Sequence, residues 1–152
     1  MQSNSFKLLW LSSITISLLL TSCYDIITNS SLSIKNKTNR QITVLYSNGS
    51  NPEVTENNIA YYISDQHVIK PDSSASIRTL GRNDAWHNYI NEGRSKMLFI
   101  YVFDVDSLKR YDQGYSIQEL VNQKKYLKLI KYHEADLNKL CWKIDFEDEN
   151  QR

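Results

Sequence analysis

The apolar run at residues 97–103 (MLFIYVF) is the feature of this sequence that most constrains its fold. A strand with one face in water alternates apolar and polar residues, whereas this run is almost continuously apolar. It therefore predicts a central strand that is buried on both faces. No other segment of the chain makes so strong a strand prediction.

Alternating apolar and polar residues predict further strands on both sides of this run. The patterns at 32–36 and 42–46 indicate two half-buried strands that pair as a hairpin through a turn at 37–40. A second hairpin is expected around Pro71, between strands at 67–69 and 75–80. The other expected strands lie at 60–63, 127–132 and 142–146, and the breaker-rich segment 47–58 is expected to be a surface loop.

Helix signals are few and short. Asp84 can cap a helix at 84–91 that Gly93 ends. Ser116 and Glu119 have the spacing of a capping box before a helix at 117–124, and a third helix is expected at 134–140. Strands dominate, so we expect a mainly β fold. It would be an antiparallel β-sandwich-like domain, or an α+β domain, with two or three short peripheral helices.

The N-terminal segment 1–22 has the layout of a secretory signal peptide. A short polar start with one cation, Lys7, is followed by an apolar run at 8–20 and by the small residues Thr21 and Ser22. Spanning a bilayer takes roughly twenty mostly apolar residues, and this run is shorter and contains several hydroxyl side chains. The sequence therefore predicts a cleaved signal and not a transmembrane helix.

The residues Leu20-Thr21-Ser22-Cys23 resemble the lipobox of bacterial lipoproteins. The resemblance implies that a diacylglycerol is attached to the thiol of Cys23 and that cleavage occurs just before it. Several acyl chains on one residue would anchor the protein stably in a membrane. The alternative is an ordinary secreted protein cleaved near Ser22.

Composition indicates one domain without a strong charge. Removing the 22 signal residues, of which only Lys7 is charged, from the 152-residue chain leaves 130 residues with 17 basic and 17 acidic side chains. This balance argues against nucleic acid as a partner, because such binding needs a cationic excess. The expected organisation is a signal peptide at 1–22, a lipidated tether at 23–31, one β-rich domain at 32–147 and a polar tail at 148–152.

Cys141 is the second of the two cysteines. Acylation would consume the sulfur of Cys23, so we expect no intramolecular disulfide. Between Leu140 and Trp142, Cys141 is expected to pack as a small apolar side chain, because a reactive thiol needs a cationic or helix-start environment.

The apolar run ends in the carboxylates of Asp104 and Asp106. This pattern resembles the nucleophile motif of haloacid dehalogenase-type phosphotransferases, in which both carboxylates hold magnesium. That fold needs a long α/β domain after the motif, and only 46 residues follow Asp106. We therefore expect no enzyme here, and interpret the pair as strand-end carboxylates in solvent near Lys109 or Arg110. A weak cation site at Asp104, Asp106 and Ser107 remains open, as does an O-glycan on Ser107, since 106–108 resembles an acceptor for O-glycans.

No metal or cofactor is expected, because the three histidines, His67, His87 and His133, are not at metal-ligand spacing. Tyr61, Tyr62 and Trp86 are candidates for stacking on sugar rings or for anchoring a protein partner. The alternative is that these aromatic side chains fill the core.

Short segments that include Asn36-Lys37-Thr38, 99–106, 128–132 and 140–144 resemble those of a group of small uncharacterised lipoproteins of Bacteroides-type bacteria, and the likeness extends over much of the chain after residue 23. The resemblance implies a cell-envelope setting and a domain extent, but no chemistry. We expect a non-catalytic, membrane-anchored interaction or structural module, with glycan binding as the alternative. The outer membrane is the expected location, with the periplasmic face preferred, and the sequence leaves the oligomeric state open. The resemblance lies in these segments: Asn36-Lys37-Thr38, Tyr46-Ser47, Ile69-Lys70-Pro71, Trp86, 99–106, 128–132, Asp136-Leu137 and 140–144.

Overall fold

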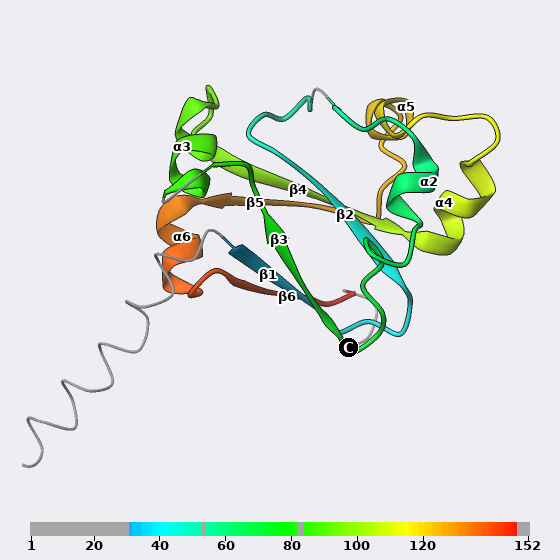
Figure 1. Ribbon diagram of the computed structural model, residues 1–152, viewed down its shortest axis with the longest axis horizontal. Coiled ribbons are helices and arrows are strands. Elements are labelled where there is room, and N and C mark those ends of the chain that lie inside the picture. The colour runs from blue at the N-terminus through cyan, green and yellow to red at the C-terminus, as the bar shows by residue number, and fades with distance from the viewer. Residues whose placement is uncertain (1–30, 53, 82–83, 149–152) are drawn as a thin grey trace, which may run out of the picture.

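The computed structural model describes residues 31–52, 54–81 and 84–148, which contain two three-stranded sheets (Figure 1). In the first, sheet A, the central strand is antiparallel to one neighbour and parallel to the other; in the second, sheet B, both pairs are antiparallel. Sheet A has the order β3 (Ser74–Arg78), β1 (Ser31–Asn36), β6 (Lys143–Phe146). Sheet B has the order β2 (Ile42–Ser47), β4 (Met97–Asp104), β5 (Lys128–His133).

Short helices surround the two sheets. In Figure 1, α3 and α6 lie near one end of the sandwich, while α2, α4 and α5 lie together at the other. The strand-rich α+β or sandwich-like domain predicted from the sequence is confirmed, with more helices in the described ranges than the expected two or three. They are α2 (Ile59–Tyr62), α3 (Ala85–Glu92), α4 (Val105–Tyr111), α5 (Ile117–Asn122) and α6 (Glu134–Lys139).

Strand β4 is buried on both faces, as its apolar run predicted. Its side chains alternate between two hydrophobic cores, which lie on opposite faces of sheet B. Leu98, Ile100 and Val102 belong to the core between the two sheets, whereas Phe99, Tyr101 and Phe103 face helices α2, α4 and α5, and none of the six is more than 3% exposed. The chain therefore has three layers, with sheet B in the middle.

Both cores draw on segments far apart in the sequence. The core between the sheets joins Leu32 of β1 and Ile144 of β6 to Leu137 of α6. The second core places Leu108 of α4 and Leu120 of α5 against sheet B. All five side chains are at most 2% exposed, and burying each contributes about 1.5–3 kcal/mol. These long-range contacts, rather than the short helices themselves, hold the outer layer in place.

The hairpin predicted for the first two strands is wrong, because β1 and β2 belong to different sheets. The side chain of Asn36, which is fully buried, holds the chain at the corner between them. Its amide nitrogen donates to the carbonyl oxygens of Arg40 at 2.8 Å and Ile69 at 2.9 Å, and its oxygen accepts from the amide and the hydroxyl of Thr38. These four bonds turn the chain out of sheet A and into sheet B.

The second predicted hairpin is also wrong. Ile69 makes a single bridge to Ile42 of sheet B, and the following strand β3 pairs with β1 in sheet A. Pro71 therefore lies in a second crossing between the sheets. Consecutive strands from β1 to β4 are therefore not neighbours in a sheet, because each crossing places them on opposite sides of the same core.

The strand predicted at 60–63 is instead helix α2. The side chain of Asn58 accepts a hydrogen bond from the amide of Ala60 at 2.9 Å and so caps the helix. Ile59 and Tyr62, three positions apart, are both buried on one face. Helix α4 was not predicted at all, and it begins where the carboxylate of Asp104 accepts from the amide of Ser107.

Both helices predicted from a capping residue are present, but the capping bond forms at Ser116 and not at Asp84. The capping box of α5 is confirmed, and hydrogen bonds from Ser116 hold the pKa of Glu119 below its ordinary value. Asp84 does precede α3, but its side chain makes no capping bond and its backbone is left-handed, with φ 65°. Gly93 ends α3 as predicted.

Replacing Asn36 by Asp is expected to lower the free energy of unfolding by about 3 kcal/mol, because both amide donors are lost and a carboxylate is buried among carbonyl oxygens. Urea denaturation followed by far-UV circular dichroism measures this change. Asn51→Asp, at an exposed position, is the matched control and should stay within about 0.5 kcal/mol of the parent. Equal stability of the two variants would show that the Asn36 side chain does not hold the corner.

Candidate functional site

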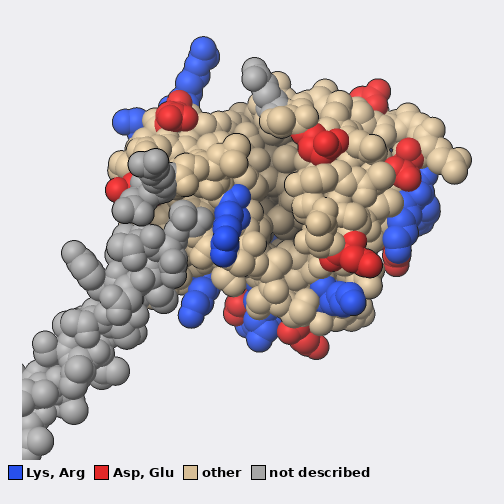
Figure 2. All heavy atoms as spheres, viewed as in Figure 1, with Lys and Arg blue, Asp and Glu red and all other residues tan. Residues whose placement is uncertain are grey.

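One side of the sandwich is open. Between β5 and β6 the side is closed by α6, whose Leu137 is fully buried in the core. Between β2 and β3, the edge strands on the opposite side, the described residues line a cleft of about 560 Å³. Clefts that bind small or extended ligands have this size. Figure 2 shows the surface hollowed at this place, with charged side chains around the hollow.

The cleft has an apolar interior and a polar rim. Consecutive residues of both edge strands line it, so the backbone of each strand is part of the wall. Among five large apolar side chains with substantial exposure in the described ranges, Tyr61 and Leu80 lie here, and Leu80 is 98% exposed. The lining consists of Val44, Leu45, Tyr46, Thr55, Glu56, Tyr61, Tyr62, Gln66, His67, Ile69, Ala75, Ser76, Ile77, Arg78, Thr79, Leu80 and Tyr89.

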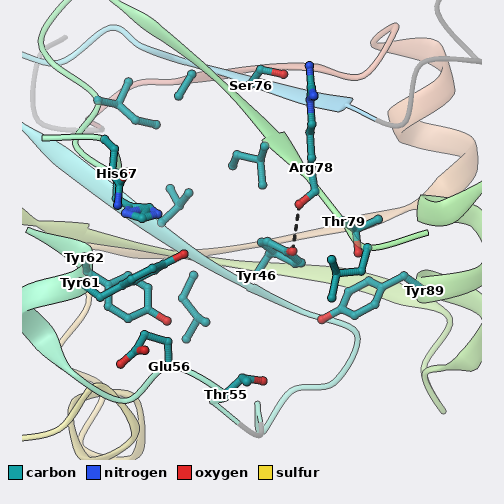
Figure 3. Close-up of a pocket in the computed structure, with 17 residues that line it drawn as sticks. Tyr46, Thr55, Glu56, Tyr61, Tyr62, His67, Ser76, Arg78, Thr79 and Tyr89 are labelled. Carbon is teal, nitrogen blue, oxygen red and sulfur yellow. Dashed lines mark hydrogen bonds between the residues drawn. The ribbon is translucent and has the colours of Figure 1, made fainter. Parts of the chain in front are cut away.

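Tyr61 and His67 form one wall of the cleft (Figure 3). Their rings lie against each other with centroids 3.8 Å apart. Burial lowers the pKa of His67, so its imidazole is neutral over most of the physiological range. The hydroxyl of Ser64 lies 3.2 Å from its Nδ1 but donates to the carbonyl of Tyr61 at 2.7 Å. This wall is therefore an uncharged aromatic surface.

Tyr46 spans the cleft from β2 to β3. Its hydroxyl donates to the carbonyl oxygen of Arg78 at 3.2 Å, a contact drawn in Figure 3. Its ring packs edge-on against Trp86 and Tyr89, with centroids 5.0 and 5.6 Å away. Burial raises the pKa of Tyr89, which keeps that phenol neutral. The hydroxyl of Tyr46 thus joins the two sheet edges at one end of the cleft.

The three aromatic residues singled out from the sequence have different positions. Tyr61 is 42% exposed, Tyr62 is 5% exposed beneath it and Trp86 is 3% exposed in the core between the sheets. Trp86 and Tyr62 therefore fill the cores, as the core-filling alternative expected, although Tyr62 also contributes to the cleft lining. Sequence reasoning missed Tyr46 and Tyr89, because only the crossing of the chain between sheets brings them together.

The carboxylates of Asp104 and Asp106 make different contacts. A carboxylate oxygen of Asp104 accepts from the amide of Ser107 at 2.7 Å at the start of α4. Asp106 is exposed and pairs with Lys109 at 3.3 Å, as the solvated-carboxylate interpretation expected. The described residues contain no group of three His, Cys, Asp or Glu side chains that could hold a metal ion. Ser107 lies beside Arg110, whose guanidinium is 3.5 Å from the serine hydroxyl.

The other two histidines are not among the residues that line the cleft. His87 of α3 has its Nδ1 2.9 Å from the carboxylate of Glu134, and His133 has its Nδ1 3.3 Å from the carbonyl of Lys96. Both contacts are exposed. Each histidine therefore has a local hydrogen-bonding partner, and neither shares a site with His67.

The predicted signal peptide, the lipidation site at Cys23 and the tether up to residue 30 lie outside the described residues, so they stay predictions. Ser31, the last residue of the predicted tether, is instead the first residue of β1. Cys141 is disulfide-bonded, so the expectation that it forms no disulfide is wrong. It lies at the end of α6, where Cys141 and Trp142 both have left-handed backbones, with φ 51° and 57°. No helix among the residues that the structure describes is long and apolar enough to cross a membrane.

Comparison with known proteins adds no relative. No protein-family model matches the chain, and neither a curated protein nor a solved structure matches it significantly.

Asp104→Ala is expected to lower the free energy of unfolding by about 1 kcal/mol, because the first turn of α4 loses its cap. Asp106→Ala should change it by less than about 0.5 kcal/mol, because its ion pair with Lys109 is exposed. Thermal and urea denaturation measure both changes. A magnesium-dependent phosphoesterase activity that disappears in both variants would contradict the structural interpretation of these carboxylates.

Proposed function

We propose that this protein is a lipid-anchored, non-catalytic binding module of a bacterial cell envelope, and that its ligand site is the cleft between β2 and β3. The open cleft carries the proposal, because it combines two unpaired strand edges with exposed apolar side chains. Exposed apolar surface of this kind in a small domain marks binding sites. The lipobox-like sequence before Cys23 supports the anchor.

The anchor would hold the cleft close to a membrane. Cys23 precedes the first residue of β1, Ser31, by eight positions, and eight extended residues span at most about 29 Å. Ser31 pairs with Arg78, which lies at one end of the cleft. A lipid on Cys23 would therefore keep the site within about one domain diameter of the bilayer surface.

The contents of the cleft support binding rather than catalysis. Nucleophilic catalysis needs a nucleophile whose proton passes to an adjacent base. His67 is the imidazole in the lining, and the hydroxyl near it, that of Ser64, gives its proton to the carbonyl of Tyr61. The rest of the lining consists of apolar and tyrosine side chains, strand backbone and a polar rim that includes Glu56 and Arg78.

Glycan binding is the second candidate, supported by the exposure of Tyr61 at the rim. Sugar rings stack on free aromatic faces, and one face of Tyr61 already lies against His67. Tyr46 is likewise engaged with Trp86 and Tyr89. The available aromatic surface therefore favours a partner that uses backbone and apolar contacts.

A photo-cross-linking side chain, p-benzoylphenylalanine, at position 61 is expected to give a discrete adduct when living cells are irradiated, because Tyr61 lies at the cleft rim. The same substitution at Tyr115 is the control, since that side chain is 44% exposed against 42% for Tyr61 but lies outside the cleft lining. Electrophoresis of the purified protein reads out the adduct. Adducts of equal yield at both positions, or none at position 61, would contradict a cleft-based site.

Cys23→Ala is expected to abolish labelling of the protein by radioactive palmitate and to release it from the membrane fraction, because the acceptor thiol is removed. The full-length gene is expressed in a lipoprotein-processing bacterium, and the labelled band and the fractionation are compared with wild type. Cys141→Ala is the matched control and should retain both label and membrane association.

Intact mass and non-reducing peptide mapping complete this test. A sulfur that carries a thioether-linked lipid cannot also form a disulfide, so in a chain with two cysteines the proposed anchor and an intramolecular disulfide of Cys141 exclude each other. An acylated N-terminal peptide beginning at Cys23 supports the anchor. A mature protein whose Cys23 and Cys141 peptides are linked to each other, without acyl mass, contradicts it.

A further inference from the structure

The outer edge of β2 carries the beginning of a fourth strand of sheet B. The amide and carbonyl of Ile42 exchange two hydrogen bonds with those of Ile69, at 3.1 and 2.8 Å. This antiparallel rung stands alone, because the chain then turns away and the amide of His67 donates to Ser64 at 2.9 Å. The places opposite Val44 and Tyr46, which a longer strand would occupy, open into the cleft.

Val44 and Tyr46 point their backbone groups into that cleft. In an antiparallel pair, successive residues direct their N–H and C=O groups alternately toward one neighbour and the other. The carbonyl of Gln41 accepts from Val105 on the β4 side, and Ile42 bonds to Ile69 on the cleft side. By the same alternation, Val44 and Tyr46 present two donors and two acceptors to the cleft.

Apart from the pairing within sheet B, the described residues make no backbone hydrogen bond to these groups of Val44 and Tyr46. Unpaired strand edges of this kind are templates for another extended chain. Natural domains protect such edges with charged side chains, and the edge strands β5 and β6 carry Lys131 and Lys143. Strand β2 contains no charged residue. Its edge therefore lacks the usual protection against an added strand.

We propose that the cleft binds a single extended peptide segment, which adds to β2 as an antiparallel strand opposite Val44 and Tyr46. The proposal rests on the function proposed above and names its ligand class. The bound segment continues the ladder that the Ile42–Ile69 rung begins. It therefore has three central residues in register with Val44, Leu45 and Tyr46.

The walls of the cleft define the side chains of this segment. Residues opposite Val44 and Tyr46 point to the same side as those two side chains, toward Ala75 and Ile77 of sheet A, and apolar side chains fit there. The residue between them points to the side of Leu45, toward α2 and Glu56.

Glu56 is the acidic residue among the described lining residues, and its carboxylate lies beside the tyrosines in Figure 3. The side chain of Arg78, by contrast, extends away from the labelled tyrosines in that view. A basic residue therefore suits the central position of the ligand, and the recognised pattern is apolar-basic-apolar.

The experiment uses capped pentapeptides of the form Thr-x-z-x-Thr, with valine, isoleucine or phenylalanine at x and lysine or arginine at z. Calorimetric titration of the purified full chain should give saturable 1:1 binding for members of this set. N-methylation of the two x residues should weaken binding at least tenfold, because those amides donate to β2. Glutamate at z should also weaken it several-fold. Hydrogen exchange of the Val44 and Tyr46 amides should slow when peptide is bound.

Val44→Pro is the decisive variant, because it removes a donor that faces the cleft and leaves the bonds to β4 in place. It should weaken binding at least tenfold. Lys131→Pro is the matched control on the opposite edge of sheet B, where Lys131 pairs with Phe99 and its amide points outward, and it should bind like the parent. Glu56→Gln, which keeps the shape of the side chain, should reduce the preference for lysine over glutamate at z. Circular dichroism checks that each variant is folded.

Absence of binding by every peptide in the set, or equal binding by folded Val44→Pro and the parent, would overturn strand addition. Binding of cello- or chito-oligosaccharides in place of the peptides would also overturn it and support the glycan alternative. A position-specific adduct at residue 61 without peptide binding would leave the proposed function standing and remove this inference. Loss of the adduct would remove the proposed function itself.

Discussion

The burial of β4 on both faces is the constraint on which the rest of the structure depends. A strand whose six central side chains are at most 3% exposed needs a layer on each side, and this domain supplies one with sheet A and the other with short helices. The helical layer would not be stable alone, since isolated helices of four to eight residues are marginal in water. The stability of the folded domain therefore comes from the packing of residues distant in sequence around β4.

That dependence explains what the sequence could predict. The apolar run at 97–103 predicted β4 and its burial on both faces, because the spacing of apolar residues along a strand indicates how many of its faces are covered. The capping box at Ser116 predicted the start of α5 for a similarly local reason. The pairing of strands had no such local signal. Asn36 looked like an ordinary turn residue, yet its four buried hydrogen bonds carry the chain from one sheet to the other.

The candidate site could not be predicted for the same reason. Tyr61 was recognised as an aromatic residue beside a loop, but its contact with His67 depends on irregular turns at 61–67 that the sequence pattern did not reveal. Trp86 had an equally suggestive sequence context and is instead a core residue at 3% exposure. The Asp104 and Asp106 pattern suggested chemistry, whereas the first carboxylate caps a helix that the sequence did not reveal. Side-chain type alone did not separate core from surface in these cases.

The cleft itself follows from how the two sheets are closed. One side of the sandwich is filled by α6, but the crossing that carries Ile69 past β2 supplies a single rung and then leaves. An open edge with no charged residue would ordinarily invite edge-to-edge pairing between whole domains. Here the edge faces a cleft that β3 and Tyr61 also line. The ligand proposed for this cleft is a single extended segment, which needs only the width of one strand, about 4.8 Å. One peptide strand is therefore enough to continue the ladder that the Ile42–Ile69 bridge begins.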